Sequence, residues 1–497
     1  MNIKKLILIF VLLIGFCTST NAQHPKREFR GAWIQCVNGQ FLGKSPKELR
    51  DMLSSQLDVL QGAKINAIIF QVRAEGDALY HSKMEPWSRY LTGRQGKAPE
   101  DGWDPLEWMI NECHKRDMEL HAWINPYRAK TKGTTELATN HAAIKYPERI
   151  FQYGDLYIFN PALKENIEYT CAVVEDIVKR YDVDGIHIDD YFYPYPEGGR
   201  EIPDENFYIK DKRGFDNIGD WRRDNVNKLI EALYSTIHST KPWVKFGVSP
   251  FGIYRNDKNG NNTKFGSATN GLQNYDDLYA DIILWQDKGW IDYLVPQIYW
   301  NIGTKAADYD ILCQWWNDYC SKRPLYVGQD VERTVKGADP ANPDRHQMQR
   351  KYAIQRSLPN IQGSCQWYAA SVVNNLGNYR TLLEKEFHVY PVLNPEMKFI
   401  DKKAPKKPRK ARIEVQGNRI TLAWDAPKAK KEMDKAIQYV VYMFGPGEKI
   451  DLSNPTKIQT VSRKQNFELK GNLNGHTFVI TSLDRLHNES KGLKIKL

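Results

Sequence analysis

Cysteine is scarce in this sequence, and its spacing argues against a structural metal site. Seven cysteines occur in 497 residues, and none follows the paired pattern that holds zinc. We expect buried free thiols, although an oxidising compartment would permit one disulfide. Six cysteines remain after the first segment of the chain: Cys36, Cys113, Cys171, Cys313, Cys320 and Cys365.

Beyond its first residues the sequence lacks a hydrophobic run long enough to cross a membrane. The apolar stretch 6–16 follows Lys4 and Lys5 and is too short for a span. Small residues at 20–22 complete a signal peptide, so we predict residues 1–22 to be removed and the protein to be exported to the periplasm or cell surface. A lipoprotein anchor at Cys17 is disfavoured, because bulky Phe16 precedes it.

The sequence also lacks any nucleic-acid recognition signature. The net charge is +10, which permits an anionic partner. No basic recognition helix or RNA-binding motif accompanies the charge, so we predict no nucleic-acid partner. Much of the excess lies in the Lys- and Pro-rich stretch 401–412, for which a solvated linker is favoured over a contact with an anionic polymer.

What the sequence does have is a regular alternation of strand and helix patterns. Strict alternation implies a parallel sheet, and eight units imply closure into a (β/α)8 TIM barrel over residues 28–390. The predicted strands are 30–35, 66–73, 119–125, 184–189, 245–250, 293–300, 325–330 and 363–368.

The pattern changes after residue 390. Residues 391–412 read as a linker, and residues 413–497 contain short strands at 419–424, 438–442 and 477–481. One core Trp and paired Tyr resemble a fibronectin type III sandwich. The fold class is therefore α/β, a barrel followed by a small all-β domain.

The fourth predicted strand carries the strongest chemical signal. Side chains alternate along a strand, so Ile186 and Ile188 face the helices, whereas His187 and Asp189 face the barrel interior. Almost all of the remaining strands also end in a polar residue. These residues lie at the carboxyl ends of the strands, where the active sites of barrel enzymes are found. The ring consists of Gln35, Arg73, Asn125, Asp189, Ser249, Gln297 or Tyr299, Asp330 and Gln366.

Two carboxylates in such a ring favour glycoside hydrolysis, which needs an acid and a second carboxylate. We predict Asp189 as one, with Asp330 or Asp190 as the other. Asp190 could equally set the pKa of its neighbour or cap a loop amide. Glu75 and Glu332 lie just beyond strand ends and are alternatives for which a structural role is favoured.

The remaining polar and aromatic residues at the strand ends are candidates for substrate binding. Arg73 could hold a substrate carboxylate or form a structural ion pair. His121 and His187 are interpreted as hydrogen-bonded interior residues, and loop 257–262 lacks the full calcium pattern, so no metal and no cofactor are expected. The substrate-binding candidates are Arg73, Glu75, Asn125, Tyr127, Tyr191, Gln297, Tyr299, Trp300 and Trp367.

Five motifs, in order, resemble the glycosyl hydrolase-like 10 family over about residues 28–390. They are Phe-Arg-Gly-Ala-Trp at 29–33, Gln-Val-Arg at 71–73 followed by Tyr80 and Trp87, His-Ala-Trp-Ile-Asn-Pro-Tyr-Arg at 121–128, Asp-Gly-Ile-His-Ile-Asp-Asp-Tyr at 184–191 and Pro-Gln-Ile-Tyr-Trp at 296–300. The resemblance implies an exported bacterial barrel that acts on cell-wall glycan, in some members with a C-terminal fibronectin-like module. The motif positions are Arg73, Asn125, Asp189, Asp190, Gln297 and Tyr299, whereas Asp330 lies in no motif.

The sequence therefore predicts an exported glycoside hydrolase whose partner is a glycan, with peptidoglycan strands or a related amino-sugar polymer as the expected substrate. The alternatives are a hydrolase of dietary or host polysaccharide and a non-catalytic glycan-binding or cell-envelope scaffold protein.

Overall fold

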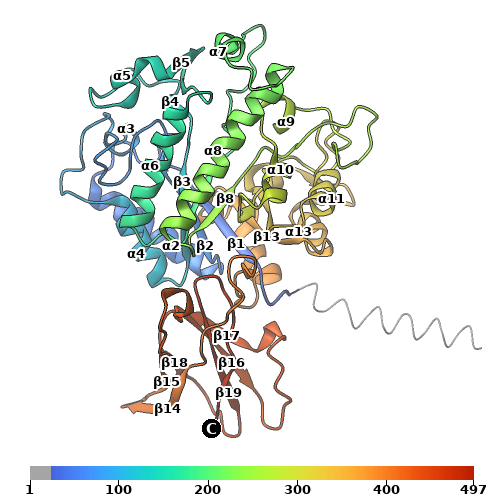
Figure 1. The fold of residues 1–497 in the computed structure, drawn as a ribbon. Coiled ribbons are helices and arrows are strands. Elements are labelled where there is room, and N and C mark those ends of the chain that lie inside the picture. The colour runs from blue at the N-terminus through green and yellow to red at the C-terminus, as the bar shows by residue number, and fades with distance from the viewer. Residues whose placement is uncertain (1–23) are drawn as a thin grey trace, which may run out of the picture.

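The computed structural model describes residues 24–497, which form a barrel followed by a smaller β module (Figure 1). The predicted signal peptide, residues 1–22, and Cys17 lie outside the described residues. Within the described part, no helix combines the length and apolar character that a membrane crossing needs. The six cysteines from Cys36 onward are free thiols.

Eight parallel strands close into a barrel, which confirms the predicted (β/α)8 fold. The strands are β1 (Phe29–Ile34), β2 (Ala67–Arg73), β3 (Glu119–Ile124), β7 (Gly185–Ile188), β8 (Lys245–Val248), β9 (Tyr293–Leu294), β10 (Leu325–Asp330) and β13 (Ile361–Trp367). Around the barrel they follow the order β1-β13-β10-β9-β8-β7-β3-β2. Because β1 pairs with both β13 and β2, the sheet has no free edge.

Strand β9 is much shorter than the stretch 293–300 that the sequence pattern predicts. Pro296 has no N–H to donate to the ladder, so regular pairing ends at Leu294. The chain stays beside its neighbours through isolated contacts, including the bond from the Gln297 amide to the Pro250 carbonyl at 2.9 Å. Residues 297–300 therefore sit in an irregular segment at the barrel mouth.

Helices surround the barrel, each in the connection that follows a barrel strand. The first, α2, begins at a capping box in which Ser45 and Glu48 satisfy each other's backbone amides, and it buries Leu49, Leu53 and Leu57. The main helices are α2 (Pro46–Gly62), α4 (Pro105–Lys115), α6 (Lys164–Arg180), α8 (Ile218–Thr240), α10 (Ile282–Lys288), α11 (Tyr309–Tyr319), α13 (Met348–Ser357) and α15 (Tyr379–Leu382).

Shorter elements decorate the connections between the strands. A three-stranded sheet, β4 (Arg128–Lys130), β6 (Leu156–Phe159) and β5 (Ile150–Tyr153), lies between β3 and α6. The others are β11 (Ala338–Asp339), β12 (Asn342–His346), α3 (Arg89–Thr92), α5 (Ala142–Lys145), α7 (Glu205–Lys210), α9 (Asn274–Asp277), α12 (Val331–Lys336), α14 (Ala369–Val373), the 3₁₀ turns η1 (Pro147–Arg149), η2 (Leu376–Asn378), η4 (Glu432–Asp434) and η5 (Pro455–Lys457), and the π turn η3 (Leu383–Phe387).

The strand alternation separates two apolar cores. Ile186 and Ile188 pack outward against the helices, as predicted. A second cluster fills the barrel interior and includes Phe29, Tyr293 and Tyr326. The interior is thus packed with large side chains and is not an open channel.

The C-terminal module consists of two antiparallel sheets, in the orders β14-β15-β18 and β17-β16-β19-β20. Trp424 packs between them with Tyr439 and Phe478. The strand β14 already begins at Arg409, inside the stretch predicted as linker. The strands are β14 (Arg409–Gln416), β15 (Arg419–Asp425), β16 (Gln438–Phe444), β17 (Ile458–Ser462), β18 (Asn466–Leu469), β19 (Thr477–Leu483) and β20 (Leu493–Lys496).

This module lies against the end of the barrel opposite the β4–β6 sheet (Figure 1). The Asp117 carboxylate accepts a bond from the Arg463 amide at 2.6 Å. The His487 imidazole reaches Glu119 at the start of β3, with 2.6 Å between Nε2 and Oε1. The carboxyl ends of the barrel strands are therefore left free of the module.

Candidate active site

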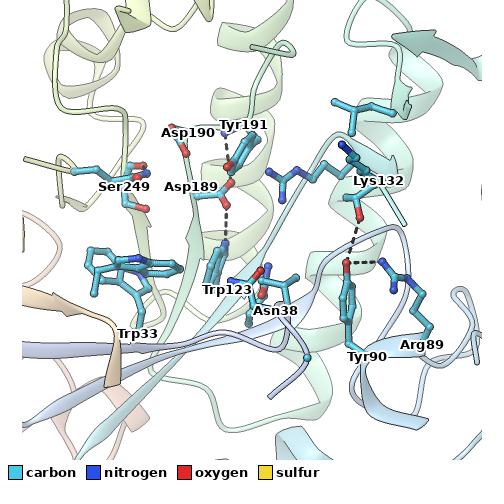
Figure 2. Close-up of a pocket in the computed structure, with 18 of the residues that line it drawn as sticks. Trp33, Asn38, Arg89, Tyr90, Trp123, Lys132, Asp189, Asp190, Tyr191 and Ser249 are labelled. Atoms are coloured by element: carbon cyan, nitrogen blue, oxygen red, sulfur yellow. Dashed lines mark hydrogen bonds between the residues drawn. The ribbon is translucent and has the colours of Figure 1, made fainter. Parts of the chain in front are cut away.

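A cavity of about 640 Å³ opens at the carboxyl ends of the barrel strands (Figure 2). Its walls combine aromatic rings, two carboxylates and three cationic side chains, which is the composition expected of a polar ligand site. The lining residues are Trp33, Val37, Asn38, Gly39, Leu42, Gln71, Arg89, Tyr90, Trp123, Arg128, Thr131, Lys132, Leu156, Asp189, Asp190, Tyr191, Ser249, Gln297, Tyr299 and Trp367.

Asp189 follows the last residue of β7 and lies at the floor of this cleft. Its Oδ2 accepts bonds from Asn125 Nδ2 at 2.6 Å and from Trp123 Nε1 at 3.2 Å. The other oxygen, Oδ1, has only a long contact of 3.4 Å with the Tyr191 amide, so it remains available to a ligand. Figure 2 shows the carboxylate held between Trp123 below and Tyr191 above.

The environment of Asp189 favours its protonated form. Burial raises the pKa of Asp189 to about 7, and the neighbouring Asp190 charge adds to the rise. Arg128 and the bond from Asn125 act in the opposite direction and limit the shift. A carboxyl that carries a proton near neutral pH can act as a general acid.

Asp190 is the second carboxylate of the cleft. Burial raises its pKa as well, against hydrogen bonds from the Tyr195 hydroxyl and the Gln297 amide that stabilise the charged form. Because two neighbouring carboxylates resist being ionised together, the two groups hold one proton more readily than none. The pair therefore supplies one acid and one carboxylate at the same place.

Arg128 is a lining cation whose charge acts on both carboxylates. Its guanidinium lies 3.3 Å from the centre of the Tyr191 ring, a cation–π contact that fixes it beside the carboxylates. As Asp189 loses its proton, this fixed positive charge stabilises the anion that remains. Arg128 was named only as part of a motif in the sequence, yet it is a main electrostatic element of the site.

Aromatic rings form a further part of the wall. The Trp367 ring lies 6.1 Å from Trp33, 6.2 Å from Trp123 and 6.3 Å from Tyr299, measured between ring centroids. Flat rings with a polar edge suit the apolar faces and hydroxyls of sugars. The predicted residues Tyr191, Gln297, Tyr299 and Trp367 all reach the cleft.

Five predicted contact residues do not line the cleft: Arg73, Tyr127, Trp300, Glu75 and Asn125. Arg73 is fully buried and forms an ion pair with Glu85, with 2.7 Å between Nη2 and Oε1. Its guanidinium also donates to the Asn125 carbonyl. Arg73 therefore links Glu85 to the backbone at the end of β3 and has a structural role. Tyr127 is likewise buried, and Trp300 packs edge-on against Phe251 at 5.3 Å.

Glu75 is the fourth, and it is the centre of a structural cluster. Its carboxylate accepts from Arg89 Nε at 3.0 Å, from Thr134 Oγ1 at 2.8 Å and from both the amide and the hydroxyl of Thr131. Burial raises its pKa, but these donors outweigh burial and bring the pKa below its ordinary value. With both of its carboxylate oxygens hydrogen-bonded, Glu75 supports Arg89 and Tyr90, which do line the cleft.

Asp330 also lies outside the lining residues. Its side chain caps α12, accepting from the Arg333 amide at 2.9 Å. The alternative Glu332 is exposed and pairs with Lys336. Among the described residues that line the cleft, Asp189 and Asp190 are the carboxylates.

Asn125 acts one layer behind the lining. It donates to Asp189 and in turn accepts from Gln71 Nε2 at 2.8 Å. Trp33, Gln71 and Trp123 were not predicted as site residues, although each points inward from a strand whose ends the polar ring had already marked. The alternation of side chains along each strand puts them on the same face as Gln35, Arg73 and Asn125, so it could have identified them.

Comparison with known proteins agrees with this picture. A family model described as "Glycosyl hydrolase-like 10" matches residues 28–345. The chain is 39% identical over 500 residues to "Glycosyl hydrolase YngK" of Bacillus subtilis, covering 98% of this chain and 96% of that protein. It is 40% identical over 329 residues to "Glycosyl hydrolase DigH" of Escherichia coli strain K12, covering 62% of this chain and 74% of that protein.

A solved structure with a similar outline is the PgaB (BpsB) glycoside hydrolase domain from Bordetella bronchiseptica. It is 10% identical, with a TM-score of 0.47, and the match covers 73% of this chain and 99% of that one. Because this score is below 0.5, the barrel assignment rests on the strand pairing described above.

Proposed function

This chain belongs to the glycosyl hydrolase-like 10 family, and we propose that it hydrolyses a glycosidic bond with Asp189 as the general acid. One observation carries the proposal: a buried carboxyl with a pKa of about 7 lies at the floor of an aromatic cleft, with one oxygen open to a ligand. Asp189 would protonate the leaving oxygen, the step that breaks the bond to the departing sugar.

Asp190 is the second carboxylate in this proposal. Hydrogen bonds from Tyr195 and Gln297 favour its charged form and oppose burial, which raises its pKa overall, so of the two groups Asp190 would be the anion while Asp189 carries the proton. It would then stabilise the positive charge that develops on the sugar ring or activate water. Arg128 would stabilise Asp189 after the proton has left.

We further propose that the substrate is an amino-sugar polymer of the bacterial envelope, such as a peptidoglycan glycan strand. The aromatic wall supports a sugar ligand, and the cations Arg128 and Lys132 support one that carries carboxylates. The signal-peptide pattern at residues 1–22 supports action in the periplasm or at the cell surface. The C-terminal module, for which we keep the fibronectin type III interpretation, would space or dock the barrel.

A panel of glycans tests the proposal. The mature protein would be incubated with peptidoglycan, with peptide-stripped glycan strands and with neutral polysaccharides, and the products analysed by mass spectrometry. Asp189→Asn is the test variant, and Asp155→Asn, which changes an exposed aspartate, is its control. We expect fragments from the wall glycans with wild type and the control, and none with Asp189→Asn.

Two results would change the proposal. Fragments from neutral polysaccharides alone would keep the hydrolase but move its substrate to dietary or host glycan. Binding without fragments from any glycan would support a non-catalytic glycan-binding protein.

A further inference from the structure

A chain of hydrogen-bonded side chains crosses the barrel interior and ends at the cleft. It begins at Glu119 Oε2, which lies 3.1 Å from His121 Nε2. His121 Nδ1 lies 2.6 Å from the Tyr293 hydroxyl, and that hydroxyl lies 3.0 Å from His187 Nδ1. His187 Nε2 then lies 2.9 Å from Ser249 Oγ, which lines the cleft. All five side chains are buried.

The lower end of this chain is fixed by charge. Burial would raise the pKa of Glu119, but Lys245 and His487 outweigh it and hold the pKa well below its ordinary value. Lys245 Nζ contacts Glu119 Oε1, and His487 Nε2 approaches the same oxygen at 2.6 Å. His487 comes from the C-terminal module, so the module contributes a residue to the base of the chain.

The ionised Glu119 determines the direction of the first bond above it, and the remaining directions follow once His121 carries one proton. A carboxylate only accepts, so His121 donates from Nε2. Lys245 Nζ already contacts Glu119 as a counter-charge, so we assign His121 a single ring proton on Nε2, which leaves Nδ1 as an acceptor. The Tyr293 hydroxyl then donates to His121, which leaves its oxygen to accept from His187 Nδ1.

The last bond follows from the same logic. Burial lowers the pKa of His187 well below its ordinary value, so the imidazole is neutral. With its proton on Nδ1, its Nε2 accepts, and Ser249 must donate to it. The carbonyl of Ile188 is a poorer alternative acceptor for Ser249 Oγ, at 3.5 Å.

We propose that this chain makes Ser249 Oγ a fixed hydrogen-bond acceptor at the cleft floor, which selects a sugar that presents a donor there. The hydroxyl has one proton, and His187 takes it, so only lone pairs face the cleft. A sugar hydroxyl or an amide N–H fits that position, whereas a ring substituent that only accepts does not. Ser249 is then a specificity residue, and His187 and Tyr293 are positioning residues that act through it. This inference rests on the proposed glycan substrate.

A simpler role is that of a satisfied polar network inside a barrel, as buried polar groups normally are. Such a network would stabilise the fold but would not require a particular tautomer at His187, nor would it affect ligand affinity. Two measurements separate the roles.

The first measures the tautomers directly in the full mature protein. Nitrogen NMR of ¹⁵N-histidine-labelled protein distinguishes Nδ1–H from Nε2–H, with the resonances assigned by comparison with His187→Gln and His121→Gln variants. We expect the proton of His187 on Nδ1 and that of His121 on Nε2. A proton on Nε2 of His187 would reverse the last bond and overturn the proposal.

The second measures affinity for peptide-stripped glycan strands in the Asp189→Asn background, where turnover does not interfere. Ser249→Ala should weaken binding about three- to tenfold, the effect of losing one neutral hydrogen bond. Tyr293→Phe should weaken it in the same direction, and the double variant should lose less than the two effects combined, because both remove one interaction. Tyr326→Phe, another buried tyrosine of the barrel interior, is the control and should bind normally.

Unchanged affinity in Ser249→Ala, with the parent protein binding the strands, would overturn the proposal. If the parent protein does not bind the strands at all, the proposed substrate fails instead. The tautomer measurement uses no ligand and still decides the bond directions, so the two failures are distinguishable.

Discussion

Replacing Asp189 by Asn should stabilise the folded protein above neutral pH while it removes the general acid. The pKa of Asp189 is raised from an ordinary value of 3.8 to about 7. Between these values the unfolded chain releases a proton that the folded protein keeps, so wild-type stability falls by about 1.4 kcal/mol for each pH unit. Asn resembles the protonated acid and does not titrate. The wild type loses about 4 kcal/mol of folding stability by the time the pH has passed 7, and the variant does not.

Thermal unfolding at pH 5 and pH 8 measures this effect. The unfolding entropy is about 2.1 cal/mol/K per residue over a barrel of roughly 360 residues. The thermal midpoint of Asp189→Asn should therefore exceed that of wild type by about 6 °C at pH 8 and about 2 °C at pH 5. The exposed substitution Asp155→Asn should change neither midpoint. Equal shifts at the two pH values, or a less stable variant at pH 8, would refute the reasoning that burial protonates Asp189.

Three further predictions concern residues in and around the site. Arg73→Met leaves the buried carboxylate of Glu85 without its partner, so urea denaturation should show the free energy of unfolding lowered by about 3–5 kcal/mol. A decrease under about 1 kcal/mol would contradict the structural role of this ion pair. Asn125→Leu removes a hydrogen-bond donor that stabilises the charged form of Asp189, so the pKa of Asp189 should rise. The alkaline limb of the pH profile of kcat/KM should then move upward by about one to two pH units. An unmoved limb would mean that another group titrates there. Trp367→Ala removes a stacking surface, so steady-state kinetics should show KM raised about three- to tenfold with kcat unchanged, whereas a fall in kcat alone would exclude a simple binding platform.

Much of the barrel and the heart of the cleft could be predicted from periodicity. The alternation of Ile186 and Ile188 with His187 and Asp189 fixed both faces of β7, and the strand ends then located the carboxylates. These patterns depend only on residues that are close in sequence, so the faces of the strand could be predicted without knowing its distant partners.

The predicted site residues that lie outside the cleft depend on distant partners or on competing local interactions. Arg73 lies at a strand end, and the sequence left a structural ion pair open for it, but its partner Glu85 lies 12 residues further along the chain and no local pattern identifies it. Asp330 is followed at once by a helix, so N-cap geometry occupies its side chain. Trp300 was predicted as a stacking platform at the end of a strand 293–300, but the strand ends at Leu294.

The most direct test of the central claim is cleavage of peptide-stripped glycan strands in heavy-oxygen water, followed by mass spectrometry of the new ends. Hydrolysis with Asp189 as the acid predicts reducing ends that carry one heavy oxygen atom, abundant with wild type and with Asp155→Asn and absent with Asp189→Asn. Products without heavy oxygen, or equal yields from Asp189→Asn, would contradict the assignment.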